Sequence, residues 1–422
     1  MIITNSKAYT ECFMQLANVL DLDEHRQTYH SWRVAAIAYK MGKLLNSTNL
    51  QEIFWSGLLH DIGAFGYNDF TVSTSDSISV LEKDKILNHT IKSANIILKD
   101  LPGEVSAIAD FVKYHHEKFD GTGFPEGLAG NDIPICSQII KLADDCDTAL
   151  RMIPEIAKKD IYGMFNRNIN SEYSPEMVSL LLETLDKDNF FDEIEIGARV
   201  PVVVNDILNS LPNYKMFIGT DLIEKITTVF ADIIDAKHEE TLGHSGRVAA
   251  YSQHIAETLK LNPKEIMKVK LAGFMHDIGK SAIPRTILNK SDNLSPFELH
   301  LIKGHAVLTM DILKKMSVFN DIVEIAGYHH ERLNGSGYPN GLPAESIPFL
   351  ARIVMVADVF DAMTSGRRYQ KYISREEAVD YIIAQKNILF DADAVDAMVE
   401  VASGELKKLA AEGLAGRASG KQ

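Results

Sequence analysis

The sequence predicts an all-α protein made of two tandem helical bundles. Apolar residues recur at three- and four-residue spacing through most of the chain, as in "HSGRVAAYSQHIAETLKL" (244–261), where Val248, Tyr251 and Ile255 form one helical stripe. Alternating strand patterns are scarce, and "ARVPVVVND" (198–206) is the one obvious β-like run. A set of histidine and aspartate landmarks also occurs twice, in the same order.

This internal repeat decides the domain organisation. The paired landmarks are separated by 214 or 216 residues, and they are His30 with His244, His60-Asp61 with His276-Asp277, His89 with His305, His115-His116 with His329-His330, and Asp144 with Asp358. A nearly constant offset over five landmarks indicates two copies of one domain.

The boundaries follow from composition. The stretch 186–220 interrupts the helical rhythm with Gly, Pro and Asn. We therefore expect a first domain over 1–195, a linker over 196–220 and a second domain over 221–405. The Ala-, Gly- and Lys-rich segment 406–422 is expected to form a flexible tail.

Composition restricts the function. The 422 residues carry 43 Lys and Arg against 58 Asp and Glu, a net charge of −15, which argues against binding a DNA or RNA polymer. Cys12, Cys136 and Cys146 have no CxxC spacing and are expected to be reduced thiols. There is no signal-peptide pattern and no apolar run of about 18 residues, so we expect a cytoplasmic protein without a membrane segment.

The repeated residues have the chemistry of a metal centre. Imidazole nitrogens combined with carboxylates suit borderline divalent metals such as iron, manganese or zinc. An aspartate directly after a histidine at a helix end, as in His276-Asp277, can bridge two ions. Adjacent histidines before a Gly-rich loop are costly to bury without a ligand, which strengthens this prediction.

Four segments of the second half together resemble the HD-GYP subgroup of HD-domain phosphohydrolases. They are "HDIGK" (276–280), His305, "HHERLNGSGYP" (329–339) and "VADVFDAMTSGRRY" (356–369), and the resemblance extends over about 220–400. It implies a helical, metal-dependent phosphodiesterase that hydrolyses cyclic di-GMP to linear pGpG and often to GMP. It also implies a centre of two or three iron or manganese ions.

The resemblance also assigns roles by position. The implied metal ligands are Glu240, His244, His276, Asp277, His305, His329, His330 and Asp358. Among them, Asp277 would bridge two ions and act in catalysis with Lys280, and Glu240 would hold a third ion. The implied substrate-binding residues are Lys280, Arg285, Gly335, Gly337, Tyr338, Pro339 and Arg367, with Arg285 the weakest of them.

The first half departs from this pattern. It keeps a full ligand set for a second metal site: His30, His60, Asp61, His89, His115, His116 and Asp144. However, Ala64 replaces Lys280 and Phe124 replaces Tyr338. Three interpretations remain: a weak second phosphodiesterase, a metal-dependent regulatory domain, or a structural partner. Loss of phosphate-binding cations favours a regulatory or structural role.

Two classes of function stay open for the whole chain. One is an enzyme that uses the second domain; the other is a non-catalytic effector that binds the dinucleotide or a partner protein. For an enzyme, 3′,3′-cyclic GMP-AMP is the alternative substrate, because base choice depends on a few hydrogen bonds outside the metal motifs. A homodimer or a signalling-protein partner is left open.

Overall fold

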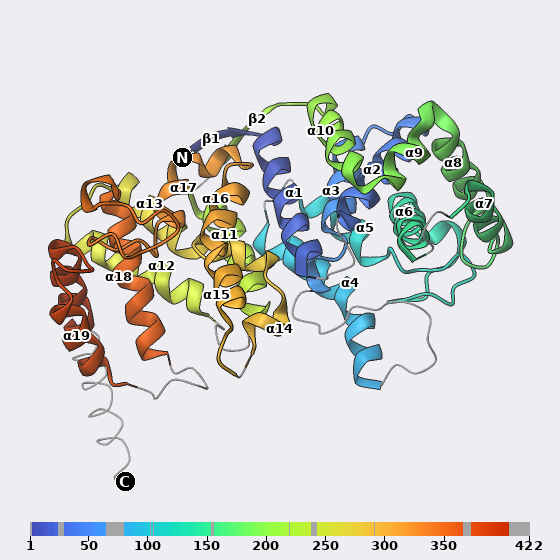
Figure 1. Ribbon diagram of the computed structural model, residues 1–422. Coiled ribbons are helices and arrows are strands. Elements are labelled where there is room, and N and C mark those ends of the chain that lie inside the picture. Colours follow the sequence, from blue (N-terminus) through green and yellow to red (C-terminus); the bar gives the residue numbers. More distant parts are fainter. Residues whose placement is uncertain are drawn as a thin grey trace, which may run out of the picture. The chain divides into compact units, whose positions relative to one another are not determined.

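The computed structural model describes residues 2–23, 29–64, 80–101, 103, 105–152, 156–218, 220–237, 243–290, 292–365 and 373–404. The chain divides into two compact units, Met1–Ile226 and Thr227–Gln422. Helices dominate both, so the all-α prediction is confirmed (Figure 1). The described strands form one two-stranded antiparallel sheet, in which Ile2 pairs with Ile218 and Asn5 with Lys215.

The first unit contains both strands and the helices that precede α11. Its strands and helices are β1 (Ile2–Asn5), α1 (Ser6–Asp23), α2 (His30–Leu44), α3 (Leu50–Leu59), α4 (Val80–Asp100), α5 (Ala109–Lys113), α6 (Ile135–Met152), α7 (Lys158–Arg167), α8 (Pro175–Asp186), α9 (Phe190–Glu195), α10 (Val200–Ser210) and β2 (Lys215–Ile218). Short 3-10 turns join several of them, including η1 (Ile62–Ala64).

The division between the units falls within α11 (Thr220–Lys237). The second unit continues with α12 (His244–Thr258), α13 (Pro263–Met275), α14 (Arg285–Leu288), α15 (Pro296–Lys303), α16 (His305–Leu313), α17 (Val323–Gly327), α18 (Phe349–Thr364) and α19 (Arg375–Ala384), and residues 392–404 are also helical. The 3-10 turn η6 (Ile278–Ala282) follows α13. The predicted tail 406–422 lies outside the described residues.

The β-like run at 198–206 was wrongly interpreted, because it lies mainly in helix α10. Pro201 occupies the first turn, where a missing N–H costs nothing. The buried side chains of α10 are Val200, Val203, Val204, Ile207 and Leu208. This spacing of three and four residues is the helical period, which prevails over the β-propensity of valine.

The structure also differs from the predicted linker over 196–220. Helix α10 packs against α2, where the Tyr39 hydroxyl and Ser210 Oγ lie 3.0 Å apart. Strand β2 pairs with β1, and the Ser6 hydroxyl donates to the carbonyl of Pro212 at 2.9 Å. Apolar burial and strand pairing therefore make this segment part of the first unit.

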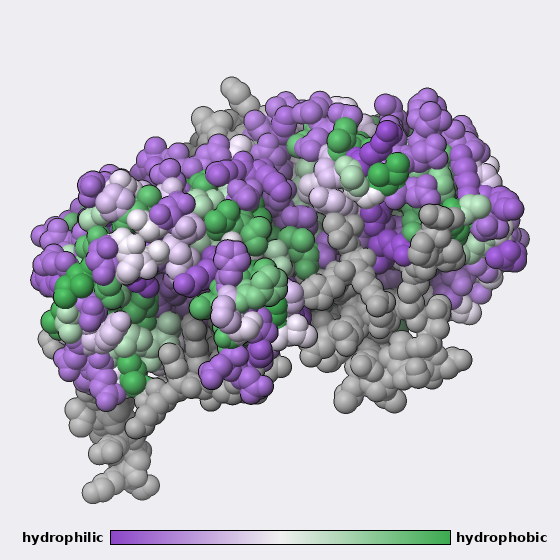
Figure 2. All heavy atoms as spheres, in the orientation of Figure 1, coloured by the Kyte–Doolittle hydropathy of each residue, from purple (hydrophilic) through white to green (hydrophobic). Residues whose placement is uncertain are grey.

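The surface offers no membrane-spanning element among the described helices, since none is both long and apolar enough. Hydrophilic residues cover most of the described surface on the face seen in Figure 2, with hydrophobic side chains in scattered patches. Burying the apolar helix faces inside each unit accounts for this distribution.

Candidate metal centre

Helix ends position most of the ligand residues in the second unit. His244 and His305 are the first residues of α12 and α16, His276 and Asp277 follow α13, His329 and His330 follow α17, and Asp358 lies within α18. His330 is partly exposed, and the other six side chains are buried. Five helices thus place these residues in one cluster.

A close contact between α12 and α13 brings the first two ligands together. A Cβ atom added to Gly273 would lie 2.7 Å from the Cα of Ala249, so only glycine allows this approach. The rings of His244 and His276 consequently lie with their centroids 5.2 Å apart. Helix α13 itself begins at a capping box formed by Asn262 and Glu265.

Backbone carbonyls orient three of the histidines. Nδ1 lies 2.8 Å from the carbonyl of Gly273 in His276, 2.6 Å from that of Ile302 in His305, and 2.6 Å from that of Ala326 in His329. In the tautomer in which Nδ1 donates, the Nε2 lone pair of each ring is left for a metal. The protein itself therefore fixes the orientation of these three rings.

The Asp277 carboxylate lies between two groups of histidines. Its Oδ2 is 3.2 Å from Nε2 of His276 and 3.7 Å from Nε2 of His244. Its Oδ1 is 3.3 Å from Nε2 of His305 and 3.9 Å from Nε2 of His329. Each oxygen faces a different pair of imidazoles, which is the arrangement needed to bridge two cations.

The Asp358 carboxylate also contacts both groups of histidines. Its Oδ1 lies 3.3 Å from Nε2 of His244 and 3.7 Å from Nε2 of His276. Its Oδ2 lies 3.8 Å from Nδ1 of His330. The second domain thus brings together all seven predicted ligands that fall within the described residues.

The electrostatics are those of a compact histidine–carboxylate cluster. Burial disfavours the charged form of His244, but hydrogen bonds to Asp358 and Asp361 outweigh it and raise its pKa to about 9. Burial lowers the pKa of His305 to about 4. Burial also opposes ionisation of Asp277, yet the neighbouring His276 and Lys280 hold the pKa of Asp277 well below its usual value.

The donor set fits divalent cations. Nε2 of His276 and Oδ1 of Asp277 are buried and form no hydrogen bond with any residue in the described part of the chain. Buried polar atoms without partners are costly, and a metal ion would satisfy both. Ligand atoms of His244, His276 and Asp358 lie within 4.8 Å of one another, as do those of His305, His329 and His330.

Lys280 and Tyr338 are also brought to this cluster. The Lys280 ammonium donates to Oδ2 of Asp277 at 2.5 Å. The Tyr338 ring lies 4.6 Å from that of His330, and the Lys303 ammonium lies 5.3 Å from the centroid of the Tyr338 ring. The sequence interpretation missed Lys303, whose counterpart at an offset of 216 is Leu87.

The signature loop depends on its glycines. Gly335 has a φ of 74°, and a Cβ atom at Gly337 would lie 2.4 Å from the backbone nitrogen of Arg332. The Tyr338–Pro339 peptide bond is cis. The Tyr338 N–H donates to the carbonyl of His330 at 3.1 Å, which holds the loop against the histidine pair.

Three further predicted residues remain outside this geometry. Arg285 is partly buried as the first residue of α14. Glu240 and Arg367 lie outside the described residues. Their predicted roles therefore remain predictions.

The sequence interpretation missed three supporting residues. Asp361 accepts from Nδ1 of His244 at 2.7 Å, and the Glu331 carboxylate accepts from the backbone N–H of Asn340 at 2.8 Å, which fixes the signature loop. Thr309 Oγ1 donates to the carbonyl of His276 and accepts from a backbone N–H. The repeat was the available signal, since Asp147, Glu117 and Ser93 stand at the matching positions.

The first domain repeats the bridging geometry. Oδ1 of Asp61 lies 3.2 Å from Nε2 of His89 and 3.8 Å from Nε2 of His115, while Oδ2 lies 3.5 Å from Nε2 of His60 and 3.8 Å from Nε2 of His30. Nδ1 of His60 and of His115 again lies against backbone carbonyls. This cluster therefore has the same donor arrangement.

The remaining two ligands of the first domain lie in the same cluster. Oδ1 of Asp144 is 3.7 Å from Nε2 of His30. The His116 ring lies 4.1 Å from that of His115 and stacks on Phe124 at 4.9 Å. Burial raises the pKa of Asp144, whereas burial is outweighed at Asp358, where hydrogen bonding to His244 holds the pKa low. The two clusters match in geometry, and the pKa of the equivalent aspartate is shifted in opposite directions.

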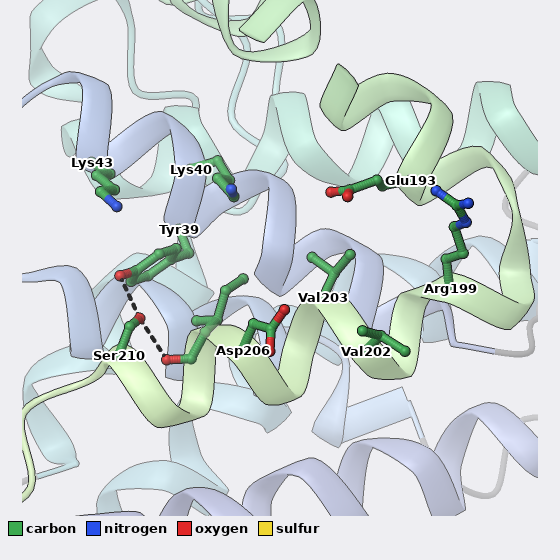
Figure 3. Close-up of a pocket in the computed structure, with 10 residues that line it drawn as sticks. Tyr39, Lys40, Lys43, Glu193, Arg199, Val202, Val203, Asp206 and Ser210 are labelled. Atoms are coloured by element: carbon green, nitrogen blue, oxygen red, sulfur yellow. Dashed lines mark hydrogen bonds between the residues drawn. The ribbon is translucent and has the colours of Figure 1, made fainter. Parts of the chain in front are cut away.

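A separate pocket of about 370 Å³ lies between α2, α9 and α10 (Figure 3). Lys40 and Arg199 line it together with Glu193 and Asp206. Lys40 lies ten positions after His30 on α2, roughly 15 Å along the helix. The pocket is thus distinct from the metal cluster, and its mixed charge indicates no particular ligand.

Fold and site together define a tandem repeat of helical domains, each gathering histidines around a central aspartate. The model of the HD domain matches residues 14–161 and 228–394, and the chain belongs to this family. The expected HD-GYP resemblance is confirmed.

Some similar proteins match most of this chain, and others match a shorter segment. The 3′3′-cGAMP-specific phosphodiesterase 1 of Vibrio cholerae is 28% identical over 387 residues, covering 88% of this chain and 86% of the relative. The cyclic di-GMP phosphodiesterase response regulator RpfG of Xanthomonas campestris is 40% identical over 149 residues, covering 34% and 39%. A solved cyclic GMP-AMP specific phosphodiesterase of V. cholerae has the same fold, with a TM-score of 0.65, 24% identity, and coverage of 94% and 97%.

Proposed function

We propose that this chain is a metal-dependent cyclic-dinucleotide phosphodiesterase and that its second domain carries out the hydrolysis. The contact of Lys280 with the bridging Asp277 carries this assignment. The first domain has the same bridging aspartate but has Ala64 at the lysine position. A phosphodiester carries a negative charge, so the domain that keeps the cation is the better hydrolase.

Each group in the second domain has a role in this reaction. The histidines and aspartates of the cluster would hold two divalent ions, with Asp277 between them. Such ions neutralise phosphate charge and lower the pKa of coordinated water. Lys280 attracts the scissile phosphate, and the Tyr338 ring beside His330 offers an aromatic face to a base.

Iron or manganese is the proposed metal, because a mixed imidazole and carboxylate set suits these borderline ions. Two ions follow from the two sides of Asp277. A third ion would require Glu240, which lies outside the described residues.

We place 3′3′-cGAMP first among the substrates. The relatives that match 88% and 90% of this chain are named for this dinucleotide. Cyclic di-GMP, which the sequence interpretation ranked first, becomes the second candidate. It is supported by the relative named for cyclic di-GMP that is 40% identical over a shorter segment. Linear dinucleotides or mononucleotides are the expected products.

For the first domain we propose a metal-dependent regulatory or structural role. Its bridging cluster around Asp61 supports metal binding, whereas Ala64 and Phe124 remove a cation and a hydroxyl. Hydrolysis is therefore assigned to the second domain alone. The cytoplasmic location and the protein partners remain predictions.

The test compares matched variants of the full chain. Protein purified anaerobically is analysed for iron and manganese per chain and assayed with 3′3′-cGAMP and cyclic di-GMP, with identification of the products. We expect Asp277→Ala to abolish turnover and Asp61→Ala to leave turnover detectable. Circular dichroism controls for folding. Turnover retained in metal-replete Asp277→Ala would refute the assignment, and binding without hydrolysis by the wild type would indicate an effector.

A further inference from the structure

Arg332 follows the histidine pair and the loop-fixing Glu331. Its Nη1 donates to the carbonyl of Glu331 at 2.7 Å and to that of His329 at 3.3 Å. The guanidinium lies 5.4 Å from the centroid of the Phe390 ring. These contacts hold the side chain in one position against the turn that carries His329 and His330.

Most of the donors of Arg332 remain available. A guanidinium carries five N–H groups, and within the described part of the chain Nε and Nη2 form no hydrogen bond. No described carboxylate forms an ion pair with Arg332. Partly buried cations normally have such a partner, because desolvating an unpaired charge is costly.

In the first domain, an acid pairs with the cation at the position equivalent to Arg332. A matching backbone hydrogen bond aligns the two domains here: the Leu333 N–H donates to the carbonyl of Leu389, and the Phe119 N–H donates to the carbonyl of Glu172, both at 3.2 Å. Lys118 occupies the Arg332 position, and its Nζ lies 3.3 Å from Oε1 of Glu172. The acid that neutralises the cation in the first domain is replaced by leucine in the second.

A second cation in the first domain is neutralised in the same way. Lys141 Nζ lies 3.0 Å from Oδ2 of Asp145 and 3.9 Å from Oε2 of Glu172. At an offset of 214, Lys141 and Asp145 correspond to Met355 and Val359. The second domain therefore has apolar residues where the first domain has these two acids, and Arg332 is the cation that it keeps.

The charge of Arg332 lies close to the metal cluster. Its Nη1 donates to the carbonyl of His329 at 3.3 Å, and the Tyr338 N–H donates to the carbonyl of His330 at 3.1 Å, so both residues adjoin the histidine pair. Asp358 is a ligand residue, and Tyr338 lies against His330. An anion bound next to the cluster on this side would meet the open guanidinium donors.

We propose that Arg332 binds the second, non-scissile phosphate of the cyclic dinucleotide. This inference rests on the proposed function. A cyclic dinucleotide contains two phosphodiesters, and only one can lie at the metals and Lys280. The other needs a cation outside the metal cluster, and the guanidinium fork matches two phosphate oxygens.

The experiment compares two substrates in the full chain. Cyclic dinucleotides carry two phosphates, whereas bis(p-nitrophenyl) phosphate carries one. For Arg332→Ala we expect KM for 3′3′-cGAMP to rise roughly 10- to 100-fold, since hydrogen bonds to a charged group are lost. The loss on bis(p-nitrophenyl) phosphate should be much smaller. Arg332→Lys should recover part of the affinity because it keeps the charge and loses the fork.

Lys118→Ala is the matched control, because it changes the equivalent position of the first domain. Equal losses on both substrates, or loss of metal from Arg332→Ala, would mean that Arg332 only supports the turn, and the proposal would be overturned. An unchanged KM would also overturn it.

Failure of the proposed function gives a different result. In that case the wild type turns over no cyclic dinucleotide, and equilibrium dialysis with 3′3′-cGAMP replaces the kinetic assay. Weaker binding by Arg332→Ala than by the wild type would then support the phosphate contact. Equal binding, or no binding by either protein, would refute it.

Discussion

Asp361 gives the sharpest test of how the second domain holds its metals. This buried carboxylate accepts from Nδ1 of His244 at 2.7 Å and from Nε and Nη2 of Arg247 at 2.7 and 3.1 Å. Asp361→Asn keeps the shape but removes the charge. A hydrogen bond to a charged group contributes about 1.5–3 kcal/mol, so the affinity of the site for metal should fall roughly 10- to 100-fold. The amide oxygen can still accept one bond, which favours the lower end.

The assay titrates metal-free protein with Mn²⁺ and follows dinucleotide turnover. The half-saturating metal concentration should rise by that factor, and turnover should largely recover at saturating metal. Asp147→Asn is the matched control, since Oδ2 of Asp147 lies 2.6 Å from Nδ1 of His30 in the first domain. Asp147→Asn should weaken metal binding in the first domain. The metal concentration that gives half-maximal turnover should stay unchanged, because it reports the second domain. An unchanged half-saturating concentration in Asp361→Asn would refute the reasoning.

Three further outcomes are expected. Gly337→Ala should destabilise the chain by about 1–3 kcal/mol and reduce turnover, because the new Cβ would lie 2.4 Å from the backbone nitrogen of Arg332. Urea unfolding measures the loss of stability. Gly404→Ala is the control, because a Cβ at Gly404 meets no described atom within 4 Å. Glu298 has its pKa lowered to about 2 by hydrogen bonds from Lys290 and the α15 cap. The contribution of ionised Glu298 to the free energy of unfolding is therefore present above pH 4.5 and lost as pH falls toward 2. The difference in stability between wild type and Glu298→Gln should disappear over that range. A difference that persists at the lowest pH would contradict the pairing. Mn²⁺ at about 1,000 times its Kd should stabilise the metal-free protein by about 4 kcal/mol, and an identical Tm with and without metal would rule out a structural contribution from the centre.

Sequence periodicity predicted helices well and failed at one informative place. In 198–206 three consecutive valines suggested a strand, yet the apolar positions of α10 follow the helical period once Pro201 begins the helix. The segment 196–220 was predicted as a linker because it contains Gly, Pro and Asn. These residues indicate turns, but they do not predict that β2 pairs with β1, more than two hundred residues earlier in the chain.

The histidines and aspartates that cluster in each domain could be selected from the sequence because each occurs twice at a near-constant offset. The supporting residues were not assigned, although the repeat contains them. The role of Asp361 depends on where α18 passes the start of α12. Such a contact is set by helix packing and is not encoded in local spacing.

The sequence by itself determined the helical class, the duplication and the repeated histidines and aspartates of both clusters, because periodicity and repetition are properties of the chain order. Only the tertiary structure decided which atoms of Asp277 face which histidines. It also showed that Glu172 pairs with Lys118, whereas a leucine, Leu389, stands at the equivalent position near Arg332. These facts depend on side chains from several helices meeting in space. Whether a cation is paired with an acid depends on which side chains meet in space, so two domains with the same motif can differ in this pairing.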